Sequence, residues 1–244
     1  MNLSLDQLVS SDTIQKIKMY ETLLREWNRR TSLVQEDTLA EFISRHVIDS
    51  LQLIPIIQTI TSLEGTSSQE FEPHVLNRLT IFEQPIERTE KDNSLLDDTS
   101  NANNHLSIID VGSGAGFPGM VLAICGFQKV TLCDSNQKKC LFLSEVARQT
   151  GTKVSIINDR VENLHNKYDL ILSRACTDLN GLCSILDSLA SSNKAYGLFH
   201  KGRNWQAELE TAYNSWRFYA SVYRSMTSLD GVVILVRQLE SINT

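Results

Sequence analysis

Several features that define other protein classes are missing from this chain. None of its 244 residues belongs to an apolar run long enough to cross a membrane. The N-terminus has no basic segment followed by an apolar one, so we expect no signal peptide and predict a cytoplasmic protein. The five cysteines are an odd number and no C-x-x-C pair occurs, which disfavours disulfide bonds and a thiolate metal site. We therefore expect neither a membrane span nor a bound metal.

An excess of positive charge is missing as well. The formal net charge of −6 argues by itself against a nucleic-acid partner. Residues 61–105, however, hold nine acidic and three basic side chains, so this segment alone accounts for −6 and the remainder is neutral. A local basic face is compatible with that balance.

The acidic segment also divides the chain. Residues 61–105 are rich in Ser, Thr, Asn, Gln and acidic residues, with a few apolar ones such as Val75 and Ile81 among them. This composition is typical of a segment that cannot bury a core of its own. We interpret it as an acidic low-complexity insertion between an N-terminal helical extension, residues 1–60, and a main domain, residues 106–244.

Apolar residues at helical spacing predict two helices in the extension, from Asp12 to Arg30 and from Thr38 to Ile57. The first is either an amphipathic packing helix with a solvated face or the basic rim of a nucleic-acid groove. In the second, Arg45, His46 and Asp49 fall within one turn, where side chains three or four apart meet. Most such clusters are local hydrogen-bonded pairs, so a functional role for His46 requires a second line of evidence.

Strand and helix patterns alternate through the main domain. Apolar, β-branched runs predict strands at 106–111, 130–134, 154–158, 168–175 and 195–202, and a closing pair at 217–223 and 232–236. Helical spacing predicts helices at 119–125, 136–150, 179–190 and 208–215. The alternation predicts an α/β fold with a mainly parallel, doubly wound sheet. Ligands of such sheets bind at the carboxyl ends of the strands.

A glycine-rich turn, from Asp110 to Gly119, follows the first of these strands. Its glycines have no Cβ, so the backbone can take a positive φ and approach a ligand closely. Gly114 to Gly119 matches the G-x-G-x-x-G pattern of dinucleotide sites. Asp110, however, places a carboxylate where a diphosphate would approach, and a carboxylate suits the amino group and sulfonium of S-adenosylmethionine. Asp110 therefore favours S-adenosylmethionine over a dinucleotide.

A second acid lies at the end of the next strand. Asp134 follows Gly116 by 18 residues, and an acid at that place accepts hydrogen bonds from ribose hydroxyls in either class of site. Asp134 thus supports the fold without choosing the ligand. A purely structural turn remains the alternative for the whole motif.

With these segments in place, the chain resembles the RsmG family, also called GidB, of bacterial small-subunit rRNA guanine-N7 methyltransferases. The resemblance spans nearly the whole chain except 61–105, and it rests on Trp27-Asn28, Arg45 to Leu51, Asp110 to Gly119, Arg160 to Glu162, Ser173 to Ala175 and Lys201-Gly202. It implies a Rossmann-like class I methyltransferase fold with the last strand antiparallel. It also implies S-adenosylmethionine as cofactor, 16S rRNA or the small ribosomal subunit as partner, and a monomer.

The resemblance also implies particular site residues. The family's cofactor contacts would be Gly112, Phe117, Val161, Glu162 and Arg174, beside Asp110, Gly114 and Asp134 from the motif itself. Arg174 would hold the cofactor carboxylate or an RNA phosphate. Lys201 is a candidate contact to the RNA backbone, and we interpret His200 beside it as a bystander. Cys176 departs from the family, which usually has an aromatic residue there. Further candidate phosphate contacts are Lys16, Arg25, Arg29, Arg30, Arg45, Lys138, Lys139 and Arg203.

Guanine N7 chemistry suits a chain without a catalytic triad. N7 is already a nucleophile in neutral guanine, so the enzyme must orient the reactants and needs no general base. N7 lies in the deep groove of A-form RNA, which predicts a loop or a splayed base as substrate. A methyltransferase acting on a small molecule or protein, and a cofactor- or RNA-binding module without turnover, remain the alternatives.

Overall fold

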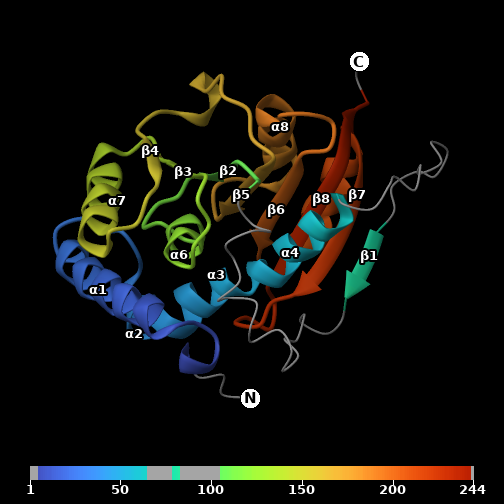
Figure 1. Ribbon diagram of the computed structural model, residues 1–244. Coiled ribbons are helices and arrows are strands. Elements are labelled where there is room, and N and C mark those ends of the chain that lie inside the picture. The colour runs from blue at the N-terminus through green and yellow to red at the C-terminus, as the bar shows by residue number, and fades with distance from the viewer. Residues whose placement is uncertain (1–4, 65–78, 83–104, 243–244) are drawn as a thin grey trace.

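A mixed sheet of eight strands forms the centre of the computed structural model (Figure 1), which describes residues 5–64, 79–82 and 105–242. The strand order is β1-β7-β8-β6-β5-β2-β3-β4. The bounds are β1 Leu79–Phe82, β2 Ile108–Val111, β3 Val130–Cys133, β4 Ser155–Ile157, β5 Leu170–Arg174, β6 Tyr196–Lys201, β7 Trp216–Arg224 and β8 Val232–Ser241.

Strand β8 runs antiparallel to both of its neighbours, β6 and β7, and the other strand pairs are parallel. This confirms the predicted α/β fold, including the reversed last strand. One strand was not predicted: β1 lies within residues 61–105 and pairs in parallel with β7. The segments 65–78 and 83–104 of the predicted insertion lie outside the described residues.

Helices cover both faces of the sheet. The larger ones are α1 Ser11–Asn28, α4 Leu53–Glu64, α6 Gly119–Ile124, α7 Gln137–Thr150, α8 Leu179–Leu189 and α9 Trp205–Tyr213. Ser10 caps α1, since its side chain accepts a hydrogen bond from the Thr13 amide, and Gly151 ends α7 in the left-handed conformation. Helix α9 begins three residues before its predicted start.

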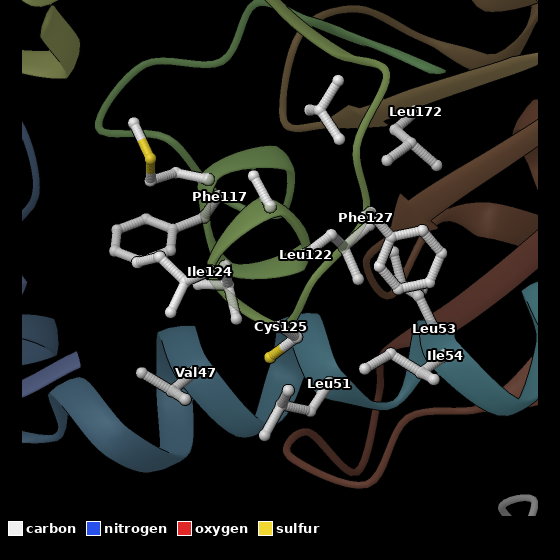
Figure 2. Close-up of a cluster of buried hydrophobic side chains, with 14 of the residues drawn as sticks. Val47, Leu51, Leu53, Ile54, Phe117, Leu122, Ile124, Cys125, Phe127 and Leu172 are labelled. Carbon is white, nitrogen blue, oxygen red and sulfur yellow. The ribbon is translucent and has the colours of Figure 1, made fainter. Parts of the chain in front are cut away.

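Two apolar cores, one on each face, hold these layers together. Neighbouring residues of β2 point to opposite faces, so Ile108 packs in one core and Ile109 in the other. The first core also contains the N-terminal helices. In Figure 2, apolar side chains of that extension (Val47, Leu51, Leu53, Ile54) lie against those of α6 and the segments beside it (Phe117, Leu122, Ile124, Cys125, Phe127). The extension is therefore packed on the helix that follows the glycine turn.

The second predicted helix, Thr38 to Ile57, is wrong as a single element. The structure has α2 Glu36–Ala40, a π-helix at Ile43–Ile48, α3 Asp49–Leu51 and then α4. Proline has no amide hydrogen and is tolerated in the first turn of a helix, which is where Pro55 lies in α4. Pro55 thus accounts for a new helix beginning at Leu53. The wider turns of π-helices occur often at functional sites, and here they carry Arg45 and His46.

Candidate active site

The glycine turn lies between β2 and α6, at the carboxyl edge of the sheet. Gly112, Gly114 and Gly116 all have positive φ, at 69°, 59° and 97°. Asp134 fixes this turn, because its Oδ2 accepts a hydrogen bond of 2.9 Å from the Gly114 amide. Its Oδ1 accepts one of 2.8 Å from the Asn136 amide at the start of α7. Asp134, the second acid predicted from the motif, therefore has a defined place beside the turn.

Asp110 lies beneath the turn and is fully buried. Its Oδ2 accepts a hydrogen bond of 3.0 Å from the Gly119 amide at the start of α6, whereas Oδ1 has no partner among the described residues. Burial raises the pKa of this carboxyl to about 7, although the Gly119 hydrogen bond and the positive charge of Arg174 oppose the shift. The carboxyl thus keeps one unused acceptor oxygen next to the glycine turn.

These features fit S-adenosylmethionine. The pKa of the Cys176 thiol is raised, mainly by burial and further by three nearby acids, Asp110, Asp134 and Glu162. Three acids therefore lie near this thiol, and such a site suits a cationic ligand. The absence of a Cβ on the glycines leaves the backbone open to a ligand. Val161 and Glu162 form a 3₁₀ turn after β4, at the same edge of the sheet. The structure thus brings together the acids and glycines predicted for the cofactor.

Phe117 is buried as part of an aromatic stack. Its ring lies between those of Tyr20 from α1, at a centroid distance of 5.3 Å, and His46, at 4.6 Å. The Tyr20 hydroxyl donates a hydrogen bond to the carbonyl oxygen of Ala115 within the turn. Phe117 as a whole residue is only 3% exposed, so its ring packs in the core beneath the turn. The extension therefore supports the glycine turn from below.

Arg174, at the end of β5, binds the extension. Its Nη1 donates to Asp49 Oδ2 at 3.2 Å and to the carbonyl oxygen of Arg45 at 3.1 Å. Its Nη2 donates to His46 Nδ1 at 3.0 Å, and its guanidinium lies 5.1 Å from the centre of the Phe117 ring. The cluster of Arg45, His46 and Asp49 is thus joined to the strand that carries the predicted cofactor residue.

A cavity of about 610 Å³ opens beside this cluster. It is lined by the side chains of Arg45, His46, Asp49 and Arg174, by His200 and Lys201 at the end of β6, and by the segment between β7 and β8. Its volume is within the range of small-molecule sites. Sequence reasoning did not find His46, Asp49 or His200 as site residues, although the spacing of Arg45, His46 and Asp49 on one turn was a usable signal.

Lys201 and His200, at the end of β6, both line the cavity. Lys201 Nζ is 2.5 Å from Glu208 Oε2 and donates to the Thr177 carbonyl oxygen at 2.8 Å, and the side chain is only 7% exposed. The charge of Lys201 is therefore paired with that of Glu208 within the protein. His200 is no bystander to the cavity, because it lines the wall and its Nε2 lies 3.0 Å from the Asp49 carbonyl oxygen.

The residues after Arg174 connect the cavity with the glycine turn. Ala175 has a φ of 58°, a left-handed conformation that costs energy for a residue with a Cβ. Ala175 lines the cavity, and Cys176 Sγ lies 3.0 Å from where a Cβ on Gly112 would be. The Arg174–Cys176 segment thus forms the boundary between the cavity and the turn, and Cys176 fills space next to Gly112.

The buried histidine of this cluster predicts a pH dependence of stability. The pKa of His46 is lowered from 6.5 to about 4, mainly by burial and then by the positive charge of Arg174. Below pH 6.5 the His46 side chain binds a proton in the unfolded chain but not in the folded chain. The contribution of the neutral His46 to the free energy of unfolding is therefore complete above pH 6.5 and declines toward pH 4. We expect His46→Gln to flatten the fall in the free energy of unfolding between these two values.

Urea unfolding measured at intervals over that pH range checks this expectation. His165→Gln, at an exposed histidine, is the matched control. An unchanged slope in His46→Gln would contradict the assignment of a buried neutral imidazole.

The basic residues predicted to bind phosphates divide into two groups. Four of them form ion pairs: Lys16 with Asp12, Arg25 with Glu21, Lys139 with Asp134 and Arg203 with Asp230. Among the described residues, no carboxylate lies within ion-pair distance of Arg29, Arg30, Arg45 or Lys138. Arg29 and Arg30 also line a second cavity, of about 450 Å³, beside Trp27.

Two negative findings concern the described ranges, 5–64, 79–82 and 105–242. No group of three or more His, Cys, Asp or Glu side chains there is arranged to hold a metal ion. No helix within them has the length and apolar character needed to span a bilayer.

A family model and individual relatives of this chain carry the same name. The family model described as "GidB: rRNA small subunit methyltransferase G" matches residues 13–64 and 91–237. Ribosomal RNA small subunit methyltransferase G of Paramagnetospirillum magneticum is 32% identical over 233 residues, which cover 95% of this chain and 91% of that protein. The protein of the same name from Orientia tsutsugamushi is 31% identical over 235 residues, 96% of each chain.

Among solved structures, magnesium protoporphyrin IX methyltransferase from Synechocystis, crystallised with S-adenosylmethionine, has a TM-score of 0.47 and 15% identity. The match covers 89% of this chain and 97% of that one.

Residues 65–90, which the family model leaves unmatched, lie inside the segment interpreted as an insertion.

The strand order, the reversed last strand and the glycine turn with its two acids define a class I S-adenosylmethionine-dependent methyltransferase. S-adenosylmethionine is therefore its cofactor. The chain belongs to the GidB family of rRNA small subunit methyltransferases. The resemblance inferred from the sequence motifs is confirmed.

Proposed function

We propose that this chain transfers a methyl group to N7 of a guanine in 16S rRNA. The proposal rests on membership of the GidB family, and the observation that carries it in this chain is the cavity that adjoins the glycine turn through Arg174–Cys176. The cofactor supplies an electrophilic methyl group on its sulfonium. The acceptor would lie in the cavity, at the carboxyl ends of β5 and β6, so that only the loop after β5 separates the two reactants.

The residues of the turn hold the cofactor in this proposal. Gly112, Gly114 and the backbone of Phe117 lie along it, Asp134 and Glu162 accept hydrogen bonds, and Val161 packs beside them. Asp110, fully buried beneath the turn, contributes by holding the Gly119 amide at the start of α6. Arg174 faces both the turn and the cavity and is the donor for the cofactor carboxylate or for an RNA phosphate.

The reaction requires alignment more than proton transfer. Guanine N7 presents its lone pair at the major-groove edge, so no side chain has to remove a proton. Holding reactants in line is worth up to about 7–11 kcal/mol of the barrier in well-oriented systems. The buried ring stack of Tyr20, Phe117 and His46 under the turn supports such an alignment.

The proposal includes a splayed or looped guanine as substrate, in naked RNA or in an assembling subunit. It also includes action as a monomer in the cytoplasm, where small subunits are assembled. Methyl transfer to RNA and to subunits that lack the modification, with the product identified as 7-methylguanosine, tests it. Transfer to a small molecule or protein in place of RNA would contradict it.

Arg29 and Arg30, at the end of α1, provide a test of RNA binding. Both are exposed and have no carboxylate partner among the described residues. We expect the double variant Arg29→Glu/Arg30→Glu to weaken RNA binding and to reduce the slope of log K against log salt by about 1–2, since each phosphate contact contributes roughly 0.7–0.9. Affinity for S-adenosylmethionine should not change.

Filter binding at several salt concentrations measures the slope, and calorimetry measures the cofactor affinity. The matched control is Arg148→Glu/Arg217→Glu, which changes the net charge equally at exposed positions on α7 and β7. If both double variants bind RNA as the unaltered chain does, the N-terminal helix is not part of the RNA surface.

A further inference from the structure

Two ion pairs lie in the wall of the cavity. Arg174 faces Asp49 at 3.2 Å, and Lys201 faces Glu208 at 2.5 Å. Burial lowers the pKa of both histidines of the wall, that of His46 to about 4. Two of the three cationic lining residues, Arg174 and Lys201, are therefore paired with a carboxylate, whereas Arg45 is exposed and has no carboxylate within ion-pair distance among the described residues.

Asp49 is the centre of this arrangement. Its Oδ1 accepts hydrogen bonds from Thr227 Oγ1 at 2.7 Å and Gln52 Nε2 at 2.8 Å. Its Oδ2 accepts from Arg174 Nη1 and lies 3.7 Å from His200 Nε2. Burial alone would raise the pKa of Asp49, but His200, Arg174 and the Thr227 hydrogen bond outweigh it and lower the pKa. The carboxylate is therefore ionised and joins four segments of the chain.

The proposed reaction changes the charge of the base in the cavity. Guanine N7 gives its lone pair to the methyl carbon, the bond from that carbon to sulfur breaks, and its electron pair remains on sulfur. The positive charge thus passes from sulfur to the purine ring, and no proton is released. An uncompensated guanidinium beside the base would repel this developing cation, because like charges interact strongly at sites shielded from water.

We propose that Asp49 is a positioning residue for methyl transfer: its carboxylate holds Arg174 in place and cancels its charge, so that the cavity accepts a guanine that becomes cationic. This inference rests on the proposed function. The N-terminal extension, which carries Asp49, then has two roles. It packs against the glycine turn, and its carboxylate balances the charge of Arg174 during the reaction.

The first experiment is single-turnover methyl transfer by Asp49→Asn with saturating S-adenosylmethionine and small-subunit RNA. Asparagine has nearly the same shape but no charge. We expect the rate to fall by about 10- to 100-fold while the affinities for cofactor and RNA change less than about 3-fold. Asp169→Asn is the matched control, since Asp169 precedes β5 at its other end and bonds Ser107 and Ser191 there. Its rate should not change.

The second experiment separates charge from structure. Guanosine and 7-methylguanosine are compared as competitive inhibitors at a pH where the methylated base is cationic. The unaltered chain and Asp169→Asn should prefer 7-methylguanosine, and Asp49→Asn should lose the preference. A structural defect alone would weaken both nucleosides equally. Thr227→Val, which removes one hydrogen bond but keeps the carboxylate, should retain the preference even if Asp49→Asn does not fold.

An equal ratio of the two inhibition constants in the unaltered chain and Asp49→Asn overturns the inference, as does loss of the preference in Thr227→Val. Normal labelling of RNA together with no preference in the unaltered chain overturns this inference alone. No labelling of RNA by the unaltered chain would overturn the proposed function and this inference with it.

Discussion

Replacement of Arg174 by alanine is expected to reduce methyl transfer by about 100-fold or more. The variant leaves the buried Asp49 without its cationic partner, and losing one member of such a pair costs roughly 2–5 kcal/mol. It also removes the donor that faces His46, Phe117 and the glycine turn. Steady-state kinetics should show a higher KM for S-adenosylmethionine as well as a lower kcat.

Arg174→Lys should not restore activity. Lysine offers a point charge, whereas the guanidinium donates in three directions, to Asp49, His46 and the Arg45 carbonyl oxygen. Arg148→Ala is the control, because Arg148 forms an exposed pair with Glu145 on α7. Activity of Arg174→Lys equal to that of the unaltered chain would show that only charge is required at this position.

Replacement of Gly116 by alanine is expected to lower the free energy of unfolding by about 3 kcal/mol or more and to abolish cofactor binding. Gly116 has a φ of 97°, which strains any residue with a Cβ. A Cβ here would lie 2.7 Å from Tyr20 Oη, 2.8 Å from Leu143 Cδ2 and 2.9 Å from Met120 Cβ. All three sides are packed, so the added methyl group has to displace its neighbours.

Gly151→Ala separates the two causes. Gly151 has a φ of 64° at the end of α7, but nothing lies within 4 Å of an added Cβ. Only the backbone strain remains there, which costs roughly 1–2 kcal/mol. Urea unfolding and calorimetry with S-adenosylmethionine measure both variants. Equal losses of stability would mean that packing around Gly116 contributes little.

Local patterns made most of the sheet predictable. Strands β2, β3, β5 and β6 are mostly buried apolar runs followed by turn residues. The glycines of the motif indicate where the backbone takes a positive φ. Strand β1 was missed because its four residues lie in a polar, acidic segment and are defined by pairing with β7, more than a hundred residues later. The end of α3 was missed because helical spacing continues across Gln52, although Pro55 signalled a new helix start.

The cofactor motif was readable in the sequence, but the cavity was not. Gly112, Gly114 and Asp134 lie within one short span of the sequence. Their spacing indicates a glycine turn after one strand and an acid at the end of the next strand. The pairing of Arg174 with Asp49 joins residues 125 positions apart, and that of His200 with Asp49 joins residues 151 apart. No periodicity links such residues. For the same reason the ion pair that satisfies Lys201 could not be foreseen from the residues around it.

The most direct test of the central claim is transfer of a radiolabelled methyl group from S-adenosylmethionine to small-subunit RNA and to subunits from a strain that lacks the modification. The labelled nucleoside is then identified by mass spectrometry. We predict label in 7-methylguanosine at a single position and none after prior methylation. Binding of S-adenosylmethionine without any label in RNA would leave the fold and cofactor intact and contradict guanine N7 as the acceptor.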